Sequence, residues 1–256
     1  MPGAFEDWYK SIPIVTRGYM TLCFLTTMAV HLDIVTIFDL YLNFGAITRQ
    51  YEFWRIFTNF FFFDYFGINF VFHMFFMVRH SKLLEETSFR GRTADYFFMY
   101  LFGAVLLMII DYVMYQLPSL PKVMFLAPSL SFMSVYVWAR RNPNVQMNFL
   151  ELLNFRAPYL PWVILGFGVL LGQSPVSDIL GIIVGHIYYF LEDVYPQTTG
   201  RRLLKTPGFI KAIFAADADP VNIQAQPQGR PWGEGQAADP NFQPDDNNNN
   251  NNLYED

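Results

Sequence analysis

The chain has 256 residues, of which 53% are hydrophobic and 19% aromatic, and its formal net charge is −5. This length corresponds to one domain, and the apolar content is far above that of ordinary globular proteins. The acidic balance gives no indication of nucleic-acid binding, and the single cysteine, Cys23, excludes an internal disulfide.

Six apolar stretches follow one another along the chain, and we predict that each is a transmembrane helix. The fourth is interrupted by Pro128 and the sixth ends at Pro196. The fourth and fifth have only 16 and 13 residues, a reach of about 20 to 24 Å against roughly 30 Å of hydrocarbon. We therefore expect the bilayer to thin there, or protein to shield these helices. The predicted spans cover residues 18–35, 57–78, 94–115, 123–138, 159–171 and 176–194.

The segments outside the spans are also informative. Residues 5–16 mix aromatic and charged side chains, as an interfacial segment does, and the apolar gap 36–56 is too short for two crossings and is expected to lie in the interface. The basic segment 201–214 is predicted to form an amphipathic helix along the cytosolic face.

Positive charge is distributed unevenly between the gaps. Fourteen of the 17 Lys and Arg residues lie before the first span, in the second and fourth gaps, or after the sixth span. Cationic segments cross a membrane reluctantly and remain in the cytosol. The sequence thus predicts an all-α polytopic membrane protein with six transmembrane helices, cytosolic N- and C-termini, and odd-numbered gaps on the lumenal or outer side.

Composition divides the chain into three parts. Residues 1–196 form the six-helix membrane domain, and residues 197–214 form a basic cytosolic juxtamembrane segment. Residues 215–256 are rich in Pro, Gly, Asp, Asn and Gln and are expected to be disordered. The run of six Asn residues from Asn247 to Asn252 has no evident chemistry.

The second predicted span carries four polar residues among its phenylalanines: Asn59, Asp64, Asn69 and His73. Asn69 and His73 are four residues apart and share a helix face. Polar groups at membrane depth are functional candidates, although each could equally serve in an interhelical hydrogen bond. Together with the two short spans, they favour a water-accessible groove.

Two further patterns lie in the first lumenal gap and the sixth span. Trp54 and Arg55 are interface-seeking residues, and Arg55 is expected to have a specific partner, either a carboxylate or carbonyls of its loop. Gly181 and Gly185 are four residues apart, which lets another helix backbone approach closely. His186 is interpreted as a hydrogen-bonded core residue in preference to a catalytic one.

Several of these residues belong to a recognisable pattern. The stretch 136–162, YVWARRNPNVQMNFLELLNFRAPYLPW, resembles the derlin signature, and the resemblance covers about residues 5 to 236. Derlins are rhomboid-like pseudoproteases of the endoplasmic reticulum that act in the removal of misfolded proteins. The resemblance implies a rhomboid-like helical bundle in that membrane, and the tail motif makes the chain most similar to metazoan-type derlins. The other matching motifs are Trp54-Arg55, Gly181-x-x-x-Gly185 with His186, and Trp232-Gly233-Glu234-Gly235-Gln236.

The resemblance also implies that the protein is not an enzyme and has no catalytic residue, metal or cofactor. Active rhomboids place a nucleophilic Ser in a G-x-S-G turn at the start of the fourth span and a His in the sixth. Here Ser129 and Ser131 have no flanking glycines, so His186 has no activated nucleophile. The residues with an implied role in a substrate groove are Trp54, Arg55, Gly181 and Gly185.

The implied partners follow from the tail and the family. Residues 232–236 resemble the core of a peptide motif that binds the hexameric ATPase valosin-containing protein, in which glycines allow an extended backbone and an aromatic ring fills a pocket. Residues 237–239 lack the basic and apolar continuation of derlin relatives, which predicts weaker binding. The other implied partners are misfolded lumenal and membrane proteins, a membrane ubiquitin ligase complex, the lipid bilayer, and further chains in a homo- or hetero-oligomer.

The predicted function is non-enzymatic retrotranslocation in endoplasmic-reticulum-associated degradation, through a thinned bilayer, a groove for misfolded proteins and a recruited cytosolic AAA ATPase. The alternative is a rhomboid-type intramembrane serine protease that uses Ser129 or Ser131 with His186. A channel or transporter is motivated only by the polar residues of the second span, and six spans without a detectable inverted repeat do not favour it.

Overall fold

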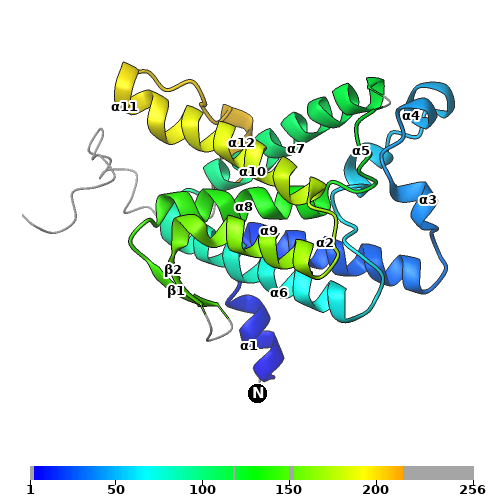
Figure 1. The fold of residues 1–256 in the computed structure, drawn as a ribbon, viewed down its shortest axis with the longest axis horizontal. Helices are drawn as coiled ribbons and strands as arrows, with labels where there is room; N and C mark the ends of the chain where they lie inside the picture. Colours follow the sequence, from blue (N-terminus) through cyan, green and yellow to red (C-terminus); the bar gives the residue numbers. More distant parts are fainter. Residues whose placement is uncertain (1–2, 118, 150–152, 216–256) are drawn as a thin grey trace, which may run out of the picture.

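The computed structural model describes residues 3–117, 119–149 and 153–215. Within these ranges most of the chain is helical, and the longer helices form a bundle around α8 (Ala127–Arg141) (Figure 1). The ATPase-binding segment predicted at 232–236 and the predicted disordered tail lie outside the described residues, except for residue 215. The other α-helices are α1 (Ala4–Lys10), α2 (Ile14–His31), α3 (Ile37–Leu40), α4 (Phe44–Gln50), α5 (Arg55–Thr58), α6 (Ile68–Leu83), α7 (Thr93–Gln116), α9 (Leu160–Leu170), α10 (Val176–Tyr189), α11 (Tyr195–Thr199) and α12 (Gly208–Ile213).

Helix α8 lies at the centre of the bundle. Every residue from Ser129 to Ala139 is buried, and α6, α7, α9 and α10 all pack against α8. Because α8 is covered on all sides, its hydroxyl groups need partners inside the protein. Ser134 Oγ donates to the carbonyl of Ser131 at 2.7 Å, whereas the buried Ser129 Oγ has no hydrogen-bond partner.

Pro128 is the second residue of α8, so it does not interrupt a helix as predicted for the fourth span. The ring lies in the first turn of the helix, where a backbone N–H has no partner within the helix in any case. The amides of Leu126 and Ala127 donate instead to the carbonyl oxygen of Asn59, at 3.1 and 3.3 Å. Proline therefore helps to start this helix at its buried end.

The second predicted span is helical over a different range. The helix α6 starts at Ile68, and a π-helical turn, η1 (Leu84–Ser88), prolongs it beyond the predicted end at residue 78. The apolar run from Phe60 to Phe63 is not part of a helix, because the side chain of Asn59 bonds to the carbonyls of Arg55 and Ile56 and terminates α5. Gly67, with φ of 178°, is extended and immediately precedes α6.

The first span is also shifted, and begins four residues before the predicted position at Gly18. The carboxylate of Glu85 accepts hydrogen bonds from the amides of Val15 and Thr16, at 3.2 and 3.0 Å, and from the Thr16 hydroxyl at 2.7 Å. A carboxylate at a helix N-terminus satisfies free N–H groups and interacts favourably with the helix dipole. Burial nevertheless raises the pKa of Glu85, with the Thr16 hydrogen bonds acting in the opposite direction.

The sixth span does not end at Pro196 as predicted. A second π-helical turn, η3 (Phe190–Val194), follows α10, and α11 continues the helix through Pro196 as far as Thr199. Pro196 is the second residue of α11 and directly follows the π-helical turn. Gly200, with φ of 69°, then ends the helix in the left-handed conformation that glycine adopts readily.

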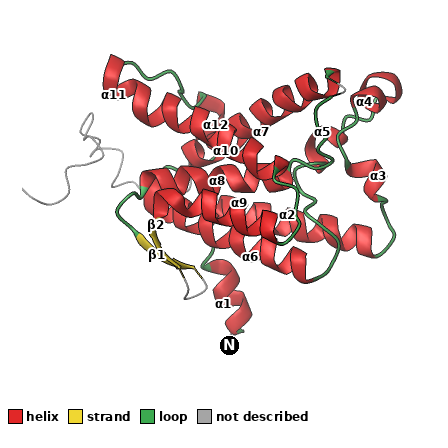
Figure 2. Ribbon diagram, in the orientation of Figure 1, coloured by secondary structure: helices red, strands yellow, loops and turns green. Residues whose placement is uncertain are grey.

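A β-hairpin in the fourth gap corrects the all-α prediction. Figure 2 shows its two strands, β1 (Gln146–Phe149) and β2 (Leu153–Arg156), which pair antiparallel with Gln146 opposite Arg156. Met147 and Phe155 are also paired, and both pack against the main core. The short alternation of polar and apolar residues is the pattern of a half-buried strand. A 3₁₀ turn, η2 (Ala157–Tyr159), joins β2 to α9.

Among the described residues, α7 is the helix that has both the length and the apolar composition needed to cross a membrane. It covers 24 residues and closely matches the third predicted span. The other five crossings, and the orientation of the termini, stay predictions.

An ion pair joins the end of α8 to the π-helical turn η3, and its side chains are only 7% (Arg141) and 12% (Asp193) exposed. Arg141 Nε and Nη2 donate to the two carboxylate oxygens of Asp193 at 2.9 and 3.0 Å, and the Phe89 ring lies 4.5 Å from the guanidinium. Burial disfavours the charged form of Arg141, but Asp193 together with Tyr188 and Glu192 outweighs this effect, and the Arg141 pKa is raised. The two charges therefore depend on each other.

We expect Asp193→Ala to lower the free energy of unfolding by about 3 to 5 kcal/mol, because it leaves the Arg141 charge buried without its partner. The matched control is Glu6→Ala, which removes the exposed Glu6–Lys10 pair and is expected to cost about 0.5 kcal/mol or less. Denaturation of the purified protein in detergent measures both values. Equal stability of the two variants would contradict a structural role for the buried pair.

Candidate functional site

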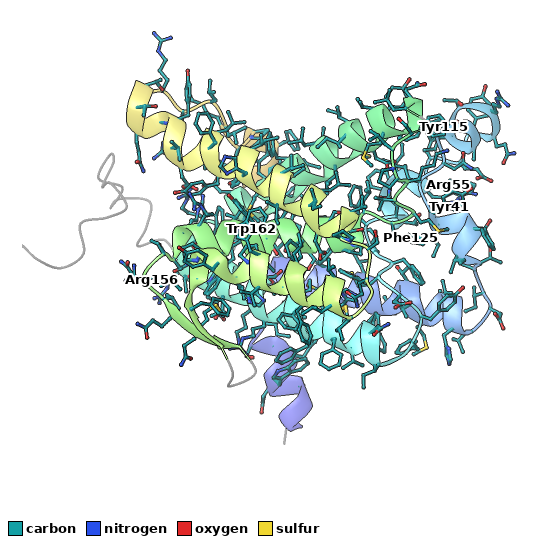
Figure 3. The ribbon with its side chains drawn as sticks, in the orientation of Figure 1. Tyr41, Arg55, Tyr115, Phe125, Arg156 and Trp162 are labelled. Atoms are coloured by element: carbon teal, nitrogen blue, oxygen red, sulfur yellow. The ribbon has the colours of Figure 1, made fainter. Side chains whose placement is uncertain are left out.

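Arg55 organises the first predicted lumenal loop. Its side chain is 6% exposed, and it donates from Nε to Glu52 and from Nη1 to the carbonyls of Phe38 and Tyr41. The Tyr41 ring lies 5.4 Å from the guanidinium, and Figure 3 shows the two side chains side by side. The prediction that Arg55 has a carboxylate or loop carbonyls as partner is confirmed.

Trp54 and Thr58 secure the same loop. Trp54 Nε1 donates to the carbonyl of Asp39 at 3.2 Å, and Thr58 Oγ1 donates to that of Leu40 at 3.0 Å. Asp39 itself accepts from Thr36, which lowers the Asp39 pKa. The Trp54-Arg55 pair thus holds α3 against α5 mainly through backbone carbonyls, and the Glu52 and Asp39 carboxylates add charge contacts with Arg55.

A cavity of about 380 Å³ lies between α6, α8 and the segment that runs from α9 into α10. Ser131, Phe132 and Val135 of α8 form its buried floor, and Asn69 and His73 line it from α6. Of the four polar candidates of the second span, these two therefore reach the cavity, as their shared helix face predicted.

The other two polar candidates have local roles. Asn59 is fully buried, and its carbonyl caps the start of α8. Its side-chain oxygen has no hydrogen-bond partner. Asp64 lies in the irregular segment before α6, where its carboxylate accepts from the amide of Tyr65 at 2.8 Å. Neither residue lines the cavity, so of the four predicted groove candidates only Asn69 and His73 do.

Three polar residues of the cavity lining were not among the predicted groove residues: Ser131, Gln173 and Asp178. Gln173 lies in the turn between α9 and α10, and Asp178 lies in the first turn of α10. The sequence signal was the proximity of these two residues to the short fifth span. Their convergence on Asn69 and His73 depends on how α6 and α9 lie along α8.

Gly181 and Gly185 bring α10 against α8. A Cβ atom at Gly181 would lie 2.6 Å from the carbonyl oxygen of Ser129, and one at Gly185 would lie 2.9 Å from the Tyr136 ring. Such distances leave no space for any side chain. The close approach predicted from the G-x-x-x-G spacing is present, with α8 as the partner helix.

His186 is paired with a tyrosine. Its Nδ1 lies 2.8 Å from the hydroxyl of Tyr136, two turns along α8 from Ser129. Ser129 lies opposite Gly181, five residues before the histidine on α10. At 1.5 Å per residue, His186 is therefore displaced along α10 by about 7.5 Å from the turn that faces Ser129.

Comparison with known proteins identifies the family. The family model described as "Der1-like family" matches residues 12–208, which is most of the chain. The chain belongs to the Der1-like family. Derlins are membrane proteins of the endoplasmic reticulum that act in endoplasmic-reticulum-associated degradation, and membership supports a role of this kind.

Individual derlins are similar over nearly their whole length. The chain is 56% identical over 221 residues to a probable derlin-2 homolog of Dictyostelium discoideum, covering 86% of this chain and 87% of the relative. It is 51% identical over 239 residues to Derlin-2.1 of Zea mays, covering 92% and 95%. It is 52% identical over 221 residues to Derlin-2 of Oryza sativa subsp. japonica, covering 85% and 89%. These three organisms are not animals, so the metazoan-type assignment stays a prediction.

We expect Arg55→Lys to loosen the first loop of this derlin. Lysine cannot reproduce the forked contacts of the guanidinium with two carbonyls and a carboxylate. The free energy of opening the loop should therefore fall by about 1 to 3 kcal/mol. Hydrogen exchange of residues 37–41 should accelerate by at least about tenfold. The matched control is Arg49→Lys at an exposed position of α4, which should leave exchange unchanged. Unaltered exchange in Arg55→Lys would show that the carbonyl contacts do not hold the loop.

A second prediction concerns the contact between α8 and α10. We expect Gly181→Ala to destabilise the derlin by about 1 to 3 kcal/mol, because the added methyl group meets backbone atoms of α8 that cannot move independently. Gly18→Ala is the control, since its Cβ would meet no atom within 4 Å. Thermal unfolding in detergent compares the two, and a Gly181→Ala protein as stable as Gly18→Ala would disprove the close contact.

Proposed function

We propose that this derlin is a non-enzymatic retrotranslocation factor, and that the cavity between α6 and α9 admits misfolded polypeptide from the lumenal side. The observation that carries the proposal is the convergence of polar side chains on that cavity, which lies among segments predicted to span the membrane. Asn69, His73 and Gln173 offer hydrogen bonds to a polypeptide backbone. An unpaired backbone group in hydrocarbon costs several kcal/mol, so such partners lower the barrier to passage.

The short helix α9 beside the cavity supports local thinning of the bilayer. It has 11 residues, which correspond to about 17 Å along its axis, and part of its surface is exposed. This length is below the roughly 30 Å of a hydrocarbon core, whereas α8, which is also short, is shielded by protein and does not contribute. A shorter hydrophobic length draws the two surfaces together, which shortens the apolar path for cargo.

In this proposal the family motifs act through structure and not by touching cargo. Trp54 and Arg55 hold the lumenal loop, and the neighbouring Asn59 caps α8, the floor of the cavity. Gly181 and Gly185 fix α10, whose first turn supplies Asp178 to the lining. These residues set the width of the groove.

The non-enzymatic assignment is supported by the hydrogen bond between His186 and Tyr136. Nucleophilic catalysis by serine requires a base within hydrogen-bond reach of its hydroxyl. The buried Ser129 hydroxyl has no hydrogen-bond partner among the described residues, so no base is positioned to activate it.

The remaining parts of the proposal are the six-span topology with cytosolic termini and the capture of a valosin-containing-protein-type ATPase by residues 232–236. They also include cooperation with a membrane ubiquitin ligase, and misfolded lumenal and membrane proteins as cargo. An ATPase bound near the cytosolic exit would supply the pulling force that a passive groove lacks.

The cavity is tested by replacing its polar groups. We expect Asn69→Leu combined with His73→Leu to slow the degradation of a misfolded lumenal substrate several-fold, because cargo loses its hydrogen-bond partners. Thr26→Leu on α2 makes the same kind of change outside the cavity lining and should leave turnover normal. Pulse–chase in cells that lack the endogenous derlin measures both, and normal turnover in the double variant would refute the groove.

The tail forms the second arm of that experiment. Trp232→Ala with Gly235→Ala should abolish recovery of the ATPase in a pull-down from gently solubilised membranes, whereas the cavity variant should retain it. The two losses are therefore separable. Cleavage of a membrane substrate that requires Ser129 or Ser131 would support the protease instead.

A further inference from the structure

The juxtamembrane segment after α11 is docked on the bundle. Residues 201–207 have no regular structure, and the short helix α12 then packs against α7. Ile210 is only 1% exposed, and the Phe214 ring lies 5.5 Å from that of Phe97. The prediction of an amphipathic helix over 201–214 is thus too long, because the helix covers six residues and one of its apolar side chains is buried against protein.

One hydrogen bond between side chains ties this segment to α7. Thr206 Oγ1 donates to Asp95 Oδ1 at 2.5 Å. The other carboxylate oxygen of Asp95 accepts from Arg92 at 2.7 Å. The Thr206 side chain therefore contacts the Asp95 carboxylate as a neutral hydrogen-bond donor, and the contact depends on the hydroxyl proton.

Thr206 has the local setting of a substrate for a proline-directed protein kinase. It is half-buried, precedes Pro207, and lies in a stretch without helix or strand, as an extended kinase substrate requires. Exposed basic residues precede it at Arg201, Arg202 and Lys205. A brief opening of the segment would present the hydroxyl to an enzyme.

We propose that Thr206 is a phosphorylation site whose modification releases α12 from α7. The γ-phosphoryl group of a nucleoside triphosphate is transferred to Thr206 Oγ1. The bond from the γ-phosphorus to the bridging oxygen breaks, a new bond to Oγ1 forms, the hydroxyl proton passes to the base of the kinase, and a nucleoside diphosphate leaves.

Electrostatics determine the direction of the change. The phosphate removes the donor of the Thr206–Asp95 hydrogen bond and places about −1.5 to −2 charges within a few ångströms of the Asp95 carboxylate. Arg92 and Lys211 of α12 both already act on the Asp95 carboxylate, so neither cation can fully compensate the new charge. A helix as short as α12 is not stable in isolation, so once undocked it is expected to unfold.

Release would lengthen the connection between the bundle and residues 232–236. The consequence for ATPase capture rests on the proposed function, but docking can be measured without reference to it. Failure of the ATPase pull-down therefore leaves the docking experiment valid, and the reverse also holds.

The test is hydrogen exchange of the full-length protein in detergent, before and after treatment with a proline-directed kinase and a nucleoside triphosphate. Mass spectrometry is expected to find phosphate on Thr206, and the protection of the amides of 208–214 should fall by about tenfold or more. Thr206→Val keeps the branched shape but cannot be modified, so kinase treatment should leave its exchange unchanged.

Two substitutions separate charge repulsion between residues 206 and 95 from a general loss of stability of the bundle. One adds a negative charge and the other removes one. Thr206→Glu should lose protection over 208–214, and adding Asp95→Asn should restore it, whereas exchange in α2 should stay the same in every variant. Three results would overturn the proposal: no phosphate on Thr206, unchanged protection after phosphorylation, or increased protection. The last would mean that the phosphate pairs with Arg92 and Lys211 and strengthens docking.

Discussion

Two glycines on α10 let its backbone lie against α8, and this contact determines the position of most other features. Any Cβ at Gly181 would meet the Ser129 carbonyl oxygen at 2.6 Å, so neither helix can shift without opening a gap. The contact places His186 beside Tyr136 and places Asp193 where Arg141 can form its paired hydrogen bonds. Helices that approach this closely gain dispersion energy along their whole interface, which suits a membrane, where lipid tails provide no hydrophobic drive between helices.

The two ends of the bundle are held by different chemistry. At the predicted lumenal end, Arg55 and Trp54 bond to backbone carbonyls of a short loop. At the predicted cytosolic end, buried or half-buried carboxylates connect separate elements: Glu85 holds the start of α2, Asp193 holds α8, and Asp95 holds the segment before α12. A contact with a charged carboxylate changes in strength when another charge is added beside it, whereas a contact with a neutral backbone carbonyl changes less. At the predicted cytosolic end carboxylate contacts join separate elements, so a charged modification there can alter how those elements dock, whereas the Arg55–Glu52 pair lies within one loop.

The cavity lies beside the rigid pair of α8 and α10. Its floor is α8, whose residues from Ser129 to Ala139 are buried, so widening of the cavity must come from movement of α6 or α9. Helix α9 is the shortest of the helices around it and is followed by a turn that contributes Gln173. The cavity is thus bounded by the buried helix α8 on one side and by the short helix α9 on another. Its polar groups can hydrogen-bond to any polypeptide backbone, so it can admit chains of varied sequence without a pocket shaped for one side chain.

The sequence by itself determined the family, the close helix contact at Gly181 and Gly185, the partners of Arg55, and the shared face of Asn69 and His73, because each follows from local spacing or residue chemistry. It placed the ends of the second and sixth helices incorrectly, since apolar runs and prolines do not show where a carbonyl such as that of Asn59 will cap another helix. The hairpin, the pairing of His186 with Tyr136 and the docking of Thr206 on Asp95 join residues far apart in the chain. These contacts depend on tertiary packing, because each one forms and contributes free energy only after the helices have come together.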